Sequence, residues 1–149
     1  MTDVGKRPYE RYVIRGAQAE ELAFHGTKMK EAYKILLSNK LIPGANYYIT
    51  LWETATIPPD NPTCSLHAHE VDQIAIYIRE KDTFQVTYPL VPPGKAVIDE
   101  YTAHKEDEYT LKETGLFYIP KGVKHNVRFD KVGKPVIEIG ISLGKGTYP

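Results

Sequence analysis

The chain has 149 residues, which is the size of a single domain. Its 19 lysine and arginine residues balance 19 aspartate and glutamate residues, so the strongly basic surface typical of nucleic-acid-binding proteins is not expected. A single cysteine, Cys64, excludes an internal disulfide framework and favours a reducing compartment, and no apolar run approaches the ~20 residues of a membrane span. We therefore expect a cytoplasmic protein that binds neither nucleic acid nor membranes.

Only the first third of the chain has helical periodicity. Residues 9–15 have the composition to add a strand, and residues 17–24 are long enough for two helical turns. Thr27 is a plausible N-cap for a longer helix at residues 28–40. In that segment apolar side chains recur at three- and four-residue steps and define one face: Met29, Ala32, Tyr33, Leu36 and Leu37.

From residue 45 onward the apolar period changes to two, which predicts strands. Residues 57–62 are rich in proline and predict a loop. Frequent turn residues between short strands are typical of a sandwich or barrel. We predict one structural domain, in which an N-terminal extension of residues 1–44 packs on a barrel of residues 45–149. The predicted strands are residues 46–53, 66–69, 73–79, 83–88, 96–102, 108–111, 116–119, 125–129 and 135–143.

Three histidines lie in patterned surroundings. His67 and His69 are separated by one residue, so on a regular strand both imidazoles point to the same face. Two neutral imidazoles on one face form half of a site for a first-row transition metal. His125 follows Pro120 and Gly122, which shape a turn and place this histidine at the start of a strand.

These residues together resemble the two sequence motifs of the cupin superfamily. His67-x-His69-x-x-x-Gln73 has the ligand spacing of the first motif, and Pro120-x-Gly122-x-x-His125 matches the centre of the second. The resemblance covers residues 46–143 and implies a mainly β fold, a single double-stranded β-helix (jelly-roll) barrel. It also implies one divalent transition metal (iron, zinc, manganese or nickel) bound by His67, His69 and His125, with Gln73 as a fourth ligand.

The sequence departs from the family pattern at several positions. Asn61 and Glu80 stand where the first motif has glycines, and Phe129 stands where the second has asparagine, which affects the shape of the loops. Gln73 replaces a glutamate, so a neutral and weaker ligand takes the place of a carboxylate. Asp72, one residue earlier, is the alternative ligand. The family spacing and the alternating run that begins at Gln73 favour the glutamine.

Two further residues are candidates for catalysis. Tyr77 lies on the same face as Gln73 and either contacts a substrate or packs in the core with its hydroxyl satisfied. Glu138 interrupts an apolar strand, so its carboxylate either faces water or is buried with partners as a general base. Trp52 is expected to be a core or dimer contact. Cys64 is three residues before His67, so on a regular strand its thiol faces away from the histidines.

The resemblance implies an enzyme that acts on a small polar metabolite through dioxygenase, isomerase or lyase chemistry. The alternative is a non-catalytic cupin that binds or senses a small molecule with the help of a metal. A third hypothesis makes the three histidines hydrogen-bonded structural residues. A homodimer is expected, because cupins commonly pair through barrel strands or an N-terminal strand.

Overall fold

A computed structural model describes residues 9–16 and 33–146 of the chain. Its regular structure is almost entirely β-strand, with two short 3₁₀ helices, η1 (Glu10–Tyr12) and η4 (Lys105–Asp107). In the described residues no helix has the length and apolar character needed to cross a membrane. The strands in chain order are β1 (Tyr33–Leu37), β2 (Tyr47–Thr54), β3 (Gln73–Ile78), β4 (Phe84–Pro89), β5 (Glu108–Leu111), β6 (Gly115–Ile119), β7 (Arg128–Val132) and β8 (Val136–Leu143).

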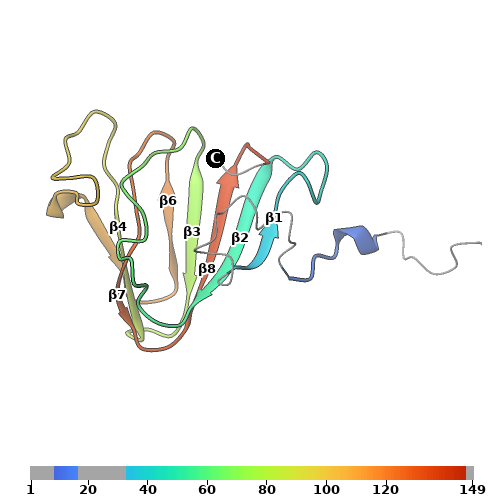
Figure 1. Cartoon of the computed structure of the whole chain (residues 1–149), viewed down its shortest axis with the longest axis horizontal. Coiled ribbons are helices and arrows are strands. Elements are labelled where there is room, and N and C mark those ends of the chain that lie inside the picture. The colour runs from blue at the N-terminus through green and yellow to red at the C-terminus, as the bar shows by residue number, and fades with distance from the viewer. Residues whose placement is uncertain (1–8, 17–32, 147–149) are drawn as a thin grey trace, which may run out of the picture.

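The strands form two antiparallel sheets that face each other (Figure 1). The larger sheet has the order β1-β2-β8-β3-β6, and the smaller has the order β5-β4-β7. Strands far apart in sequence are neighbours in both sheets, as β2 and β8 are, because the chain crosses from one sheet to the other several times. This topology is that of a jelly-roll barrel, so the predicted mainly β fold is confirmed.

The core lies between the two sheets and is built from alternate residues of the facing strands. On β3, Ala75 and Tyr77 are buried, whereas Ile78 on the opposite face is 40% exposed. Val127 and Phe129, at two-residue steps after His125, are buried in the same core. The period-two pattern therefore identifies the inward face of these strands correctly.

The helix predicted for residues 28–40 is wrong in its described part. Residues Tyr33–Leu37 form strand β1, which pairs with β2 at the edge of the larger sheet. The apolar residues of this short run have helical spacing, but the run pairs with β2, which begins ten residues after β1 ends. These strand-to-strand hydrogen bonds override the local preference for a helix. Residues 17–32, with the other predicted helical turns and the Thr27 cap, lie outside the described residues. The strand predicted at residues 9–15 is also wrong, because η1 forms there instead.

Two predicted strands are loops in the structure. Residues 96–102 turn back on themselves, because the Asp99 carboxylate accepts a hydrogen bond from the Tyr101 amide and the Ile98 amide donates to the Thr102 carbonyl. Residues 66–69 form only an isolated bridge between His67 and His125. This bridge is enough to bring the two histidine motifs together.

Candidate metal centre

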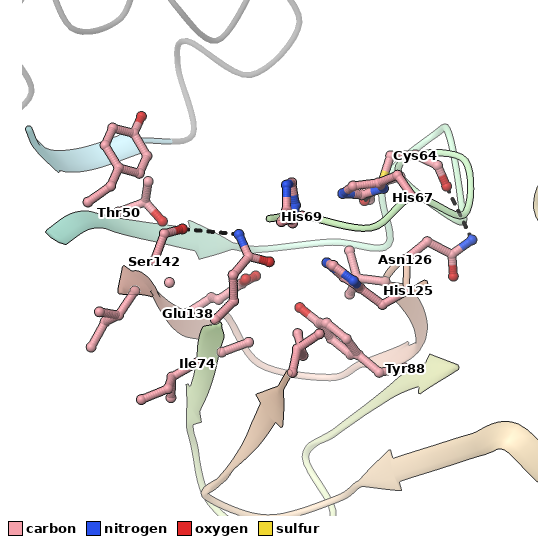
Figure 2. Close-up of a pocket in the computed structure, with 18 of the residues that line it drawn as sticks. Thr50, Cys64, His67, His69, Ile74, Tyr88, His125, Asn126, Glu138 and Ser142 are labelled. Atoms are coloured by element: carbon pink, nitrogen blue, oxygen red, sulfur yellow. Dashed lines mark hydrogen bonds between the residues drawn. The ribbon is translucent and has the colours of Figure 1, made fainter. Parts of the chain in front are cut away.

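The three predicted histidines converge at one place between the sheets. One nitrogen atom from each of His67, His69 and His125 lies within 4.8 Å of the other two. The backbones of His67 and His125 are joined by a reciprocal pair of hydrogen bonds of 3.1 and 2.8 Å, which sets the two rings side by side. Figure 2 shows the three rings around a common space, although they come from two distant segments.

The hydrogen bonds around two of these rings leave a nitrogen atom of each ring ready to bind a metal. Nδ1 of His67 lies 2.8 Å from the carbonyl oxygen of Ser65, and Nδ1 of His125 lies 3.1 Å from that of Val123. A carbonyl only accepts, so each Nδ1 carries the hydrogen and each Nε2 holds a lone pair. Orientation of a ligand imidazole by a backbone carbonyl is usual in metalloproteins. The residues therefore fit a divalent transition metal.

The environments of His125 and His67 act on the imidazole pKa in opposite directions. Burial lowers the pKa of His125 to about 4, and the neighbouring His67 and His69 rings act in the same direction. The pKa of His67 is raised, first by a hydrogen bond with the Cys64 side chain, against the opposing effect of burial. Cys64 thus lies beside His67, and the expectation that it faces away is wrong, because residues 66–69 do not form a regular strand.

Gln73 and Asp72 have clearly different positions. Gln73 begins β3 and lines the cavity next to the histidines, where its Nε2 donates to Ser142 Oγ at 3.0 Å. Asp72 accepts hydrogen bonds from the Tyr118 hydroxyl and from the Lys121 amide at 2.8 Å, and it does not belong to the histidine group. Of the two alternatives, the structure brings Gln73 to the cavity.

A cavity of about 170 Å³ opens beside the histidines. Its walls include inward residues of β2 and β8 that the sequence motifs do not contain. Thr50 and Trp52 come from β2, and Glu138 and Ser142 come from β8. The alternation of side chains along β2 and along β8 is the sequence signal that these four residues share one face of the sheet. The pairing of β2 with β8 brings the four side chains together.

The Glu138 carboxyl is one of these buried wall groups. Its side chain accepts a hydrogen bond from the indole of Trp52, which is half-buried and lines the cavity. Burial raises the pKa of Glu138 to about 7, although hydrogen bonds from Tyr77, Trp52 and Tyr88 act in the opposite direction. A carboxyl with this pKa exchanges protons easily near neutral pH.

Tyr77, the other catalytic candidate, lies behind the cavity rather than on its wall. Its side chain is fully buried, and its hydroxyl is 2.8 Å from that of Tyr88. Tyr88 does line the cavity, and its ring stacks against His125 with an interplanar angle of 9°. Tyr77 is therefore one side chain removed from any molecule in the cavity.

Comparison with solved structures identifies the fold. A cupin-like protein from Thermotoga maritima is 18% identical, with 92% of this chain and 84% of that protein aligned at a TM-score of 0.50. An oxalate oxidase in complex with a substrate analogue, glycolate, is 11% identical over 76% of this chain and 51% of that protein, with a TM-score of 0.51. The chain has the cupin fold. No protein-family model and no curated protein matches it.

Two departures from the cupin motifs are joined in space. Asn61, which stands in place of a motif glycine, donates from Nδ2 to the Phe129 carbonyl at 2.7 Å and accepts from the Phe129 amide at 2.9 Å. Phe129 itself stands where the second motif has asparagine, and its side chain fills the core of the cupin barrel. The departures thus alter how a loop is attached and leave the histidine cluster in place.

Proposed function

We propose that this cupin is a mononuclear metal-dependent enzyme that acts on a small polar metabolite. Support for the proposal comes from the convergence of His67, His69 and His125 beside a cavity, with two of the rings oriented by backbone carbonyls. Iron, zinc and nickel suit imidazole ligands, and manganese prefers oxygen ligands such as the Gln73 carbonyl. A bound metal supplies Lewis acidity or oxygen activation, the chemistry of isomerases, lyases or dioxygenases.

Gln73 is the proposed fourth ligand. Its Nε2 is directed to Ser142, which leaves Oε1 as the amide atom that accepts from or coordinates a partner. A neutral oxygen compensates no charge, so the three imidazoles remain the strong ligands of the site. The other positions around a metal then stay open for a substrate.

Glu138 is the proposed acid–base residue. It lies on the cavity wall, and a pKa of about 7 allows both protonation states near neutral pH. Its carboxylate takes a proton from the bound metabolite and returns a proton later in the turnover, so the carboxyl ends each cycle as it began. Tyr77 contributes through its hydrogen bond to Tyr88 and acts as a positioning residue.

Metal content tests this proposal directly. Purified wild-type protein is compared by elemental analysis with His67→Ala and His125→Ala, and His104→Ala is the matched control because His104 lies outside the cluster. We expect close to one transition metal per chain in wild type and in the control, and little in the two cluster variants. Equal metal in all four proteins contradicts the proposal.

A metal-assisted sensor is the second candidate function, and the Gln73 amide favours it. Loss of a carboxylate from the metal shell is one way in which a site keeps binding while turnover is lost. Thermal-shift screening of small metabolites on the metal-loaded protein, followed by assays of turnover and oxygen consumption, separates the two functions. Conversion of any ligand supports the enzyme, and binding with no conversion across several metals supports the sensor.

We further propose a cytoplasmic homodimer. The single cysteine supports a reducing compartment. The outer face of the larger sheet carries apolar side chains on β3 and β6: Ile78, Leu116 and Tyr118 are each at least 40% exposed. Leu116 and Tyr118 pair in register with Ile76 and Ile74. Such a face suits pairing with a second copy. Light scattering that finds a monomer at micromolar concentration contradicts the dimer.

A further inference from the structure

The cavity beside the three histidines has a one-sided charge pattern. Among the described residues that line it, Glu138 is the one carboxylate, and none is a lysine or arginine. Sites that bind carboxylates or phosphates usually supply arginine or lysine for this purpose. Away from the histidines, an acidic group of a ligand would therefore meet the charge of Glu138 with no basic side chain on the wall to offset it.

The Glu138 carboxylate is the charged hydrogen-bond acceptor on this wall. Glu138 lies between Trp52 of β2 and Tyr77 of β3 in the sheet register, and the Trp52 indole donates to its Oε2 atom. Hydrogen bonds from Trp52, Tyr77 and Tyr88 occupy three of the about four acceptor sites of an ionised carboxylate, so one site remains for a further donor. Gln73 directs its NH₂ group to Ser142, and its carbonyl oxygen is the proposed metal ligand. The wall is thus suited to a ligand that donates hydrogen bonds.

We propose that the ligand of this site is a small molecule with one metal-binding end and one alcohol or amine end that donates to Glu138, and that the site discriminates against a second acidic group. This inference rests on the proposed function and names its substrate class. The cavity volume of about 170 Å³ agrees with a molecule of this kind, since pockets for larger ligands begin at roughly 300 Å³.

The test uses hydroxamates as probes, because a hydroxamate binds a divalent metal through two oxygen atoms and carries a variable tail. The three probes are β-alanine hydroxamate with an ammonium tail, butyrohydroxamate with an apolar tail, and succinic monohydroxamate with a carboxylate tail. Binding to the zinc-loaded full chain is measured by calorimetry at about pH 8, where a carboxyl with a pKa of about 7 is largely ionised. We expect the ammonium probe to bind at least about tenfold more tightly than the carboxylate probe.

The variant Glu138→Gln keeps the shape of the side chain and removes its charge. In this variant we expect the two affinities to converge to within about threefold. Elemental analysis compares the zinc content of wild type and Glu138→Gln. Equal zinc content shows that the substitution changes binding of the probe's tail and not binding of the metal. If Glu138→Gln does not fold, the ranking of the three probes in wild type still decides the question.

The outcomes separate the inference from the proposed function. If zinc-loaded wild type binds the carboxylate probe as tightly as the ammonium probe, the substrate class is overturned and the metal site stands. If the tail preference is present but survives in Glu138→Gln, the role of Glu138 is overturned. If the protein takes up no zinc and binds none of the three probes, the proposed function fails and the inference fails with it.

Discussion

Asn61 binds the backbone of Phe129 through both ends of its side-chain amide, with hydrogen bonds of 2.7 and 2.9 Å. The two residues are 68 positions apart in sequence. Asn61 belongs to the proline-rich loop that leads toward the first histidine pair, and Phe129 lies in β7, shortly after His125. This contact therefore joins the loop before His67 to the strand that follows His125.

Replacement of Asn61 by alanine is expected to destabilise the protein. The variant loses both hydrogen bonds and leaves the Phe129 backbone groups without these partners, which costs about 1–3 kcal/mol in the free energy of unfolding. Denaturant titration measures the loss, and Asn46→Ala is the matched control because Asn46 is exposed before β2. Equal stabilities of the two variants would show that the contact contributes nothing.

Gln73 and Asp72 are expected to differ in their effect on metal affinity. Gln73→Ala removes the proposed oxygen ligand and should weaken metal binding by about tenfold, whereas Gln73→Glu adds a charge and should strengthen it. Asp72→Asn should leave metal affinity nearly unchanged, because the Asp72 carboxylate is bonded to Tyr118 and Lys121. Competition with a chelator measures all three affinities. A larger loss from Asp72→Asn than from Gln73→Ala would make Asp72 the ligand.

Glu138 should make the stability of the metal-free protein depend on pH. Its pKa is raised from 4.5 to about 7 in the folded state, so folding favours the protonated carboxyl. Its contribution to stability is therefore complete below about pH 4.5 and is lost as the pH rises through about 7. The shift corresponds to about 3 kcal/mol.

The comparison of wild type with Glu138→Gln measures this contribution. The difference in their free energies of unfolding should move by about 3 kcal/mol in favour of the variant between about pH 4.5 and pH 8. The matched control is Glu100→Gln, which replaces an exposed carboxylate in a loop. A difference between wild type and Glu138→Gln that stays constant with pH contradicts the raised pKa.

The histidine cluster could be predicted because the spacings His67-x-His69 and Pro120-x-Gly122-x-x-His125 resemble the two cupin motifs. The resemblance implied that the two segments meet, and the backbone bridge between His67 and His125 joins them. The contact between Trp52 and Glu138 could not be predicted in this way, because it depends on the register of β2 with β8. Alternation left Glu138 with two possible faces, and only the pairing of whole strands decides between them.

The edge strand β1 was mispredicted for a related reason. A short apolar run such as residues 33–37 satisfies helical and strand periods about equally well, so its own sequence does not decide its structure. Its partner β2 lies ten or more residues downstream and supplies the hydrogen bonds that select the strand. The local pattern of apolar residues predicts β3 correctly, because the two faces of β3 differ strongly in burial. The same kind of pattern does not predict the edge strand β1.

Tyr77→Phe tests the buried hydroxyl pair behind the cavity. The change removes the partner of the Tyr88 hydroxyl at 2.8 Å, which costs about 1–2 kcal/mol in the free energy of unfolding. The change also removes a hydrogen bond that lowers the pKa of Glu138, so this pKa should rise above about 7. Metal content should stay unchanged, because Tyr77 does not line the cavity. Carbon-13 NMR of the glutamate carboxyl groups follows the titration, with the exposed Tyr109→Phe as control. An unchanged or lower pKa of Glu138 in Tyr77→Phe would show that the Tyr77 hydroxyl does not stabilise the Glu138 carboxylate.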